Sequence, residues 1–253
     1  MDDWALLRYS RHFLLPEIGI DGQERIAQST ALVVGAGGGL GSAACLYLAS
    51  AGVGTLMLVD GDVIELSNLQ RQVLHPEARV GQKKVWSAKE TLQAINPHIQ
   101  VMAFDCYADE NFLQNWVPKA DVVLVCSDSF SCRQLVNRAC LHWGKPLVNA
   151  SCIRFEGQAS TFDFRQKDSP CYHCLYPDFG DQGASCTTEG VFAPLPGIMG
   201  TIEAAEALKI LAGMPAGLVG KLLLVDVKHM DFRTIRLVRD PACTVCAAAV
   251  TLS

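Results

Sequence analysis

The segment DGDVIELSNLQRQ, residues 60–72, combines acidic residues with hydrogen-bond donors and one cation. Asp60 follows an apolar run that is interpreted as the second strand of a nucleotide-binding sheet. At the end of that strand such sheets present a carboxylate to a ribose. A ribose needs no cation, but Arg71 offers a guanidinium that can bind two phosphate oxygens at once. The block therefore predicts a polyphosphate nucleotide, with a solvated Arg71 as the alternative. The residues assigned to this site are Asp60, Ser67, Asn68, Leu69, Gln70 and Arg71.

Two further charged residues fit the same chemistry. Lys84 lies in the first turn of a predicted helix, where a cation opposes the helix dipole unless an anion binds nearby. The alternative is that Lys83 and Lys84 are both solvated. Asp128 follows the apolar run VLVC, and a carboxylate at the carboxyl edge of a parallel sheet is a natural Mg²⁺ ligand. Alternatively, Asp128 caps the helix that begins near Ser129, while Asp62 is expected mainly to form a turn.

The run VVGAGGGLGS, residues 33–42, is typical of a strand that turns into a helix. Glycines in such a turn let phosphate oxygens approach backbone N–H groups at the helix N-terminus. The run departs from the dinucleotide fingerprint, because the sixth position counted from Gly35 is Leu40. Gly38 and Gly39 are assigned to nucleotide binding, and a tight turn without a ligand is the alternative.

Two CxxC pairs, CYHC at 171–174 and CTVC at 243–246, supply four thiols. Four thiolates are the ligand set of a structural Zn²⁺ site and leave no coordination position open. The metal would join distant segments, because about seventy residues separate the pairs. Redox chemistry is the alternative. The predicted ligands are Cys171, Cys174, Cys243 and Cys246, with His173 as a spacer.

Cys186 lies in the polar segment ASCTTEGV, outside any pair and outside the apolar runs. An accessible thiol can act as a nucleophile, and an unused loop thiol is the alternative. The remaining cysteines stand in apolar contexts and are expected to be small core residues. They are Cys45, Cys106, Cys126, Cys132, Cys140 and Cys152.

The elements that position these residues alternate along the first half of the chain. Apolar runs occur at 31–34, 55–59, 99–104, 121–126 and 146–151, with helical patterns at 41–52, 83–95 and after Ser129. This alternation predicts an α/β fold whose mainly parallel sheet is covered by helices on both faces. Ligands of such sheets bind beyond the carboxyl ends of the strands.

The second half of the chain changes character. Residues 154–165 alternate as antiparallel strands do, 176–196 predict a long polar loop, and 198–212 predict a helix. The runs 221–227 and 232–238 predict a hairpin or pair of strands that completes the sheet. We expect one fused domain over 1–253, with an N-terminal helical segment (1–28), a nucleotide-binding half (29–151) and a second half (152–253).

The composition excludes several classes of protein. Hydrophobic residues make up 50% of the chain, and the formal charge of −5 argues against sequence-independent nucleic-acid binding. The start MDDWALLRYSRHF is charged throughout and is unlike a signal peptide. The uncharged stretch 27–59 holds seven glycines, which favours a buried βαβ unit over a membrane span. We expect a cytoplasmic protein with neither nucleic acid nor membrane as a partner.

In combination, these motifs resemble those of the HesA/MoeB/ThiF family, the bacterial relatives of ubiquitin-activating enzymes. The motifs are RYSRH, GGLGS, LSNLQRQ, GQKK, CSD, the paired CxxC and PGIMGTIEAAEALKILAG, and they extend over nearly the whole chain. The resemblance implies a Rossmann-like fold, a structural Zn²⁺ and a homodimer. It also implies ATP-dependent adenylation of the C-terminal glycine of a small ubiquitin-like sulfur carrier protein that ends in Gly-Gly.

By position, the resemblance assigns a role to each charged residue. Asp60 would bind the ribose of ATP, Asp128 would hold Mg²⁺, and Asn68, Arg71 and Lys84 would bind the triphosphate. The second half, 152–253, would bind the carrier and the zinc.

Two further residues gain a role from the resemblance alone. Arg11 of RYSRH would reach into the neighbouring subunit's site as an arginine finger. Cys186 falls where some members have a cysteine that joins the carrier or handles sulfur. The chain departs from the family in its additional glycine, GAGGGLG, and in Ser129, where the family usually has asparagine.

The implied reaction needs cations rather than a general base. A C-terminal carboxylate, with a pKa of about 3.5, is already ionised. It attacks the α-phosphate and pyrophosphate leaves, so the expected catalysts are Arg11, Arg71, Lys84 and Mg²⁺. The stretches NPHI and IRFEGQ favour the molybdopterin carrier over the thiamine carrier. Without a fused rhodanese-like domain, sulfur would come from another protein, such as a cysteine desulfurase or a rhodanese.

Two rival functions stay open at this stage. An NAD-dependent oxidoreductase would have an intact glycine fingerprint and an acid–base pair near the hydride site, and the sequence shows neither. A non-catalytic scaffold that binds the carrier would have no need of the Arg and Lys set.

Overall fold

The computed structural model describes residues 2–177 and 189–247. Within these residues, eight strands form one sheet in the order β3-β2-β1-β4-β5-β6-β7-β8. The strands are β1 (Thr30–Val34), β2 (Thr55–Val59), β3 (Gln100–Phe104), β4 (Val122–Val125), β5 (Leu147–Ile153), β6 (Glu156–Phe162), β7 (Lys221–Asp226) and β8 (Asp231–Arg236). The pairs from β3 to β5 are parallel, and those from β5 to β8 are antiparallel. The predicted sheet, mainly parallel and completed by antiparallel strands, is confirmed.

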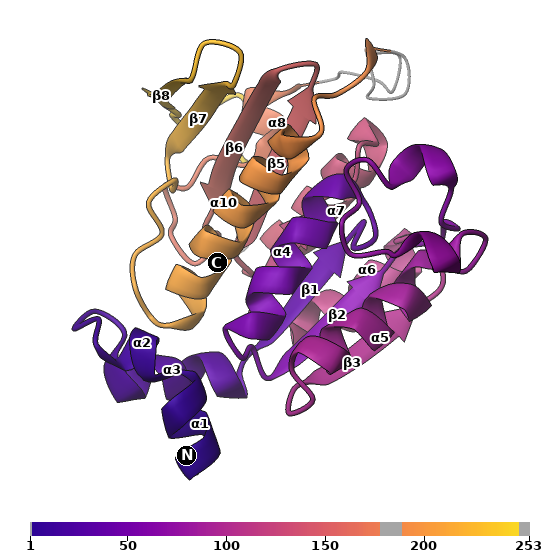
Figure 1. Cartoon of the computed structure of the whole chain (residues 1–253). Helices are drawn as coiled ribbons and strands as arrows, with labels where there is room; N and C mark the ends of the chain where they lie inside the picture. Colours follow the sequence, from indigo (N-terminus) through magenta and orange to yellow (C-terminus); the bar gives the residue numbers. More distant parts are fainter. Residues whose placement is uncertain (1, 178–188, 248–253) are drawn as a thin grey trace.

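Helices cover both faces of the sheet (Figure 1). One face packs against α4 (Gly39–Ser50), α5 (Lys84–Ile95) and α10 (Pro194–Leu211), the other against α6 (Glu110–Trp116) and α7 (Phe130–His142). In β1, Ala31 and Val33 belong to the first core, and Leu32 and Val34 to the second. Because both faces are buried, the parallel strands are continuous apolar runs in the sequence.

The N-terminal helices lie at the amino ends of the strands. They are α1 (Asp3–Arg8), α2 (Ser10–Phe13) and α3 (Gly19–Gln28). The backbone N–H of Gly54, just before β2, donates to the Ile26 carbonyl at 3.2 Å. The Arg8 side chain donates to the carbonyl of Ile95, the last residue of α5, at 2.9 Å. The segment is therefore at the opposite end of the sheet from the carboxyl edge (Figure 1).

The helix α10 begins at Pro194, earlier than the predicted start at residue 198. Proline is tolerated in the first turn because the N–H it lacks would have no partner within the helix. The end of the predicted 176–196 loop is thus the first turn of a helix. The uncharged stretch 27–59 forms β1, α4 and β2, as predicted. None of the helices in the described residues combines the length and the hydropathy that crossing a membrane requires.

Candidate active site

A cavity of about 370 Å³ opens at the carboxyl ends of β1, β2 and β4. Its lining contains most of the residues assigned from the sequence to the nucleotide: Gly38, Gly39, Asp60, Arg71, Lys84, Asp128 and Ser129. The preceding part of the polar block, Ser67, Asn68, Leu69 and Gln70, is not in this lining. The Asn68 side chain instead accepts a hydrogen bond from the Glu65 N–H at 3.4 Å, and the Ser67 carbonyl accepts one from Arg71 at 3.2 Å.

The glycine loop between β1 and α4 is fixed at Gly37. Its N–H donates to Asp60 at 2.9 Å, and its carbonyl oxygen is 3.1 Å from Nε2 of His75. A Cβ at Gly37 would lie 2.4 Å from Cβ of Lys84, so no side chain fits there. Gly37 is therefore held by protein contacts, whereas Gly38 and Gly39 border the cavity.

His75 supports the glycine loop and lines neither cavity itself. It is buried, and Nδ1 lies 3.0 Å from the Ser87 hydroxyl. Burial lowers the pKa of His75 to about 4, so the ring is neutral near pH 7. Because a carbonyl can only accept, Nε2 carries the proton and donates to Gly37. A single histidine beside an apolar run gave no sign of this role in the sequence.

Lys84 has a carboxylate partner within the protein. It is the first residue of α5, it is buried, and its Nζ lies 2.8 Å from Oδ2 of Asp62. Burial opposes ionisation of Asp62, but the hydrogen bond from Lys84 prevails and lowers its pKa. Asp62 also accepts from the Tyr107 hydroxyl at 2.9 Å, so it does more than form a turn. The alternative of two solvated lysines is wrong for Lys84, which is buried; the half-exposed Lys83 pairs with Asp105 at 2.9 Å.

Asp60 is held rigidly at the end of β2. One carboxylate oxygen accepts from the Gly37 N–H and the other from the Asp62 N–H at 3.0 Å. Burial raises the pKa of Asp60, and the positive charge of Lys84 opposes that rise. Each oxygen keeps a lone pair, because a carboxylate offers about four acceptor positions.

Asp128 is exposed at the end of β4 and borders the same cavity. The alternative that it caps α7 is wrong, because Ser129 is the N-cap and its Oγ accepts from the Cys132 N–H at 3.2 Å. No hydrogen bond or ion pair from residues 2–177 or 189–247 occupies the Asp128 carboxylate. Such an oxygen donor fits a hard cation such as Mg²⁺.

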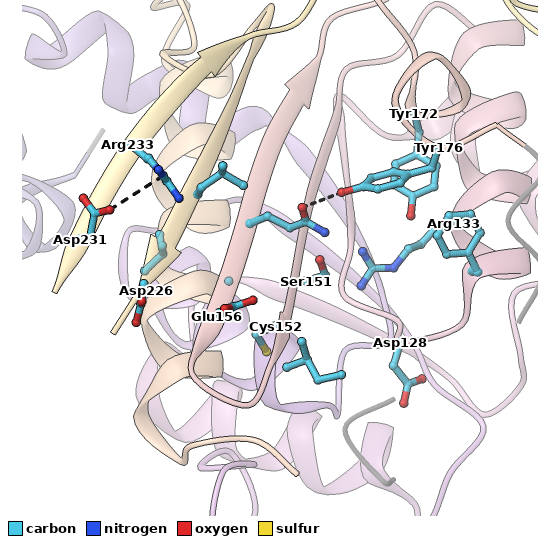
Figure 2. A pocket seen from close by; sticks show the side chains of 16 residues that line it. Asp128, Arg133, Ser151, Cys152, Glu156, Tyr172, Tyr176, Asp226, Asp231 and Arg233 are labelled. Atoms are coloured by element: carbon cyan, nitrogen blue, oxygen red, sulfur yellow. Dashed lines mark hydrogen bonds and ion pairs between the residues drawn. The ribbon is translucent and has the colours of Figure 1, made fainter. Parts of the chain in front are cut away.

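A second cavity of about 430 Å³ adjoins the first and is bordered by β5, β6, β7 and β8. Asp128, Arg133 and Cys152 line both cavities. Figure 2 shows Arg133 extending from α7 towards Ser151, with Tyr172 to one side and Asp128 to the other. No pattern in the sequence marks Arg133, although it stands five positions after Asp128 at the start of the next helix.

The four paired cysteines form one cluster. Their sulfur atoms all lie within 4.8 Å of one another, with Cys171–Cys174 at 3.8 Å, Cys171–Cys243 at 3.7 Å and Cys174–Cys246 at 3.4 Å. Tetrahedral zinc with Zn–S bonds of about 2.3 Å requires sulfur separations of about 3.8 Å. The cluster thus fits the predicted metal staple between α8 (Tyr172–Leu175) and the segment after β8.

The single cysteines differ in their surroundings. Cys45, Cys126 and Cys140 are buried, as expected for core residues, and Cys132 and Cys152 are half-buried. The expectation is wrong for Cys106, which is exposed because it follows β3 at the open edge of the sheet.

Arg11, like residues 67–70, is not brought to the cavities. Arg11 is exposed on α2, at the amino ends of the strands, and lines neither cavity. Cys186 lies outside the described residues. The roles of both residues stay predictions.

The family model described as "ThiF family" matches residues 9–245. The chain belongs to the ThiF family. It is 44% identical to the molybdopterin-synthase adenylyltransferase of Escherichia coli (strain K12), over 97% of this chain and 98% of that relative. It is 41% identical to the sulfur carrier protein ThiS adenylyltransferase of the same organism, over 98% of each chain.

The architecture of this ThiF-family chain also matches a solved structure. The crystal structure of E. coli MccB with ATP is similar at a TM-score of 0.82 and 25% sequence identity, over 94% of this chain and 73% of that one. The Rossmann-like fold implied by the resemblance is therefore confirmed.

Proposed function

We propose that this protein adenylates the C-terminal glycine of a small ubiquitin-like sulfur carrier protein, with release of pyrophosphate, for molybdopterin cofactor biosynthesis. The observation that carries the proposal is one cavity that gathers a glycine loop, Arg71, Lys84 and Asp128 at one edge of the sheet. The 44% identity to the E. coli molybdopterin-synthase enzyme supports this carrier. The thiamine-pathway carrier is the second candidate, because identity to the ThiS enzyme is 41%.

The first cavity is the proposed ATP site. Gly38 and Gly39, at the start of α4, would meet the phosphates, and Asp60 would use its remaining lone pairs on the ribose hydroxyls. Arg71 and Lys84 would contact the triphosphate, with Asn68 and Ser129 as further polar contacts. For Lys84 this means sharing its ammonium donors between Asp62 and a phosphate oxygen.

Asp128 is the proposed Mg²⁺ ligand, since its carboxylate faces the cavity without a protein partner in the described residues. When bound, the cation would neutralise charge on the phosphates. The carrier's carboxylate is already ionised, so no general base is needed. Arg71 and Lys84 would stabilise the charge that develops as the α-phosphate is attacked.

The second cavity is the proposed path of the carrier's C-terminal segment. It runs beside β5, β6 and β7 and meets the first cavity at Asp128, Arg133 and Cys152. A chain that lies in it would therefore bring its end to the nucleotide. This supports the assignment of 152–253 to carrier and zinc binding, of 29–151 to nucleotide binding and of 1–28 to an N-terminal helical segment, within one adenylation domain.

The four-cysteine cluster is proposed to hold Zn²⁺ in a structural role. The sulfur separations fit tetrahedral coordination, and four protein ligands leave no position for a substrate. Thiolates kept for metal also suit the reducing cytoplasm, which is the proposed location.

We further propose a homodimer in which Arg11 acts in the partner's site. Large apolar side chains are exposed along 6–20, with Leu7 at 79%, Leu14 at 72% and Ile20 at 53%. Exposed apolar surface of this kind is typical of an interface. Because Arg11 lies far from the cavity of its own subunit, it would reach an active site only in a second subunit. A cysteine desulfurase or a rhodanese is the proposed sulfur donor.

The test is ATP–pyrophosphate exchange with purified molybdopterin-type and thiamine-type carriers supplied in turn. Exchange that depends on one carrier identifies the substrate. If neither carrier supports exchange while both bind, the protein is a scaffold. Binding of NAD in preference to ATP would instead favour an oxidoreductase.

A further inference from the structure

Arg133 is a buried cation without an acidic partner. The residue is only 5% exposed, and in the described part of the chain it forms no ion pair. Its Nε and Nη2 donate to the Ser127 carbonyl at 2.8 and 2.6 Å, and Nη1 donates to the Asn149 amide oxygen at 3.1 Å. The Tyr172 hydroxyl is a further neutral contact. These groups orient the guanidinium but do not compensate its charge.

The nearest candidates for a counter-charge do not provide one. Asp128 borders the same two cavities, but its carboxylate is not within ion-pair distance of Arg133. Glu203 is completely buried, and its Oε2 accepts from the Cys126 thiol at 3.4 Å. Burial raises the pKa of Glu203 to about 8, so it is mostly neutral near pH 7. Because buried charges in proteins are normally paired, a missing anion is expected beside Arg133.

The position of Arg133 indicates which anion this is. It lines both the proposed ATP cavity and the second cavity, which forms a groove beside β5 and β6. Figure 2 shows it between Tyr172 and Asp128, the acid that also borders both cavities. A carboxylate that arrives through the groove must stop beside the α-phosphate, and two anions repel each other there. A guanidinium at the junction would offset that repulsion and fix the carboxylate through its planar fork.

We propose that Arg133 binds the terminal carboxylate of the carrier and holds it for attack on the α-phosphate. This inference rests on the proposed function and adds the residue that selects a free C-terminus. In the reaction a carboxylate oxygen bonds to the α-phosphorus, and the bond from that phosphorus to the leaving pyrophosphate breaks. No proton or electron is transferred to Arg133.

The test compares two forms of the carrier that supports exchange: one with the natural C-terminal carboxylate and one with a C-terminal carboxamide. Affinities are measured by calorimetry without nucleotide. The wild type is expected to bind the carboxylate form roughly ten- to a hundredfold more tightly, as for a charge-assisted hydrogen bond. In Arg133→Gln this preference should fall below about threefold. The matched control is Arg233→Gln, in the same cavity but with a side chain 70% exposed, and it should keep the wild-type preference.

Melting temperature and ATP affinity show whether Arg133→Gln is folded, since it also loses the bonds to Ser127. If it is not folded, Arg133→Lys is tested instead, because lysine keeps the positive charge but lacks the planar fork. The preference of this variant for the carboxylate form should be at least about threefold smaller than that of the wild type. Two results would overturn the role of Arg133: a wild type that binds both carrier forms equally, or a folded Arg133 variant that keeps the full preference for the carboxylate form. If the wild type still catalyses normal exchange, the proposed function is unaffected. Absence of exchange with every carrier would overturn the proposed function as well.

Discussion

At the scale of single residues, the site depends on carboxylates in very different surroundings. Asp60 and Asp62 are tied to the glycine loop and to Lys84, whereas Asp128 is exposed and unbonded among the described residues. Glu203 is buried, and its carboxyl group accepts from the Cys126 thiol and from the Ala150 backbone. The first two therefore shape the site, Asp128 is available to bind a cation, and Glu203 is held neutral by its surroundings.

Asp128→Ala should reduce pyrophosphate exchange to near zero while the melting temperature stays within about 2 °C of wild type, as for a surface substitution. The carboxylate supports nothing else in the described structure, so its loss removes only the proposed Mg²⁺ ligand. Asp105→Ala is the matched control: this acid follows the neighbouring strand β3 and pairs with Lys83, but lines neither cavity. Normal exchange by a folded Asp128→Ala protein would exclude the magnesium role.

Glu203→Gln should change how stability depends on pH. The folded protein holds the Glu203 proton up to a pKa of about 8, while the unfolded chain releases it near pH 4.5. Folded protein thus binds more protons in this window, so the contribution of Glu203 to stability is full below pH 4.5 and is lost as the pH rises through 8. The variant lacks this titration.

The measurement is the melting temperature of both proteins from pH 5 to pH 9. The variant is expected to gain stability relative to wild type across that range. His75 titrates with the opposite sign, since its pKa is lowered, but it is present in both proteins and cancels in the difference. A constant difference at all pH values would show that Glu203 is not protonated in the folded state.

At the scale of elements, the cysteine cluster ties α8 to the segment that follows β8. Tyr172 of α8 is buried in the second core, but few apolar side chains pack against the cysteine cluster itself, among them Leu141, Phe164 and Val245. A metal bound by the cluster would therefore take the place of a hydrophobic core around these four cysteines.

Cys174→Ala should release one zinc per chain and lower the melting temperature clearly, because metal binding adds directly to the free energy of folding. Elemental analysis and thermal unfolding, each with and without a chelator, measure both effects. Cys106→Ala is the control, since this exposed thiol lies outside the cluster. Wild-type protein purified without added chelator but free of zinc would contradict the assignment.

At the scale of the whole molecule, one sheet joins the proposed nucleotide and carrier sites, while the N-terminal helices stand at its other end (Figure 1). If Arg11 is catalytic, it must therefore act on a second subunit. The quaternary structure would then be part of the active site.

Arg11→Ala and Arg71→Ala should each be inactive, and mixing them under subunit exchange should restore activity. In a mixed dimer one site keeps both arginines, because Arg11 acts in the partner's site and Arg71 acts in the site of its own subunit. Half the dimers are mixed at random exchange and each has one intact site, so roughly a quarter of wild-type activity is expected. Failure to recover activity, with exchange confirmed by mass spectrometry, would mean that Arg11 does not act in trans.

The sequence by itself determined the strands, most helices and the chemical types of the site. Buried parallel strands leave continuous apolar runs, and CxxC pairs and a cation after a strand-end acid are local patterns. Such signals survive without knowledge of the fold, because each depends on neighbours in the chain. Even the start of α10 was missed only by one turn, where proline in a first turn is indistinguishable from proline in a loop.

Only the tertiary structure decided which groups meet. Lys84 pairs with Asp62, which is 22 positions away in the sequence. His75 bonds to Gly37, which is 38 positions away. The unpaired charge of Arg133 becomes apparent only when α7, β4 and β5 are placed around it. These contacts have no sequence pattern, because the distance between side chains on different elements is set by how the helices and the sheet pack. The sequence therefore supplied the charges, and packing decided which of them are neutralised within the protein and which are left for a ligand.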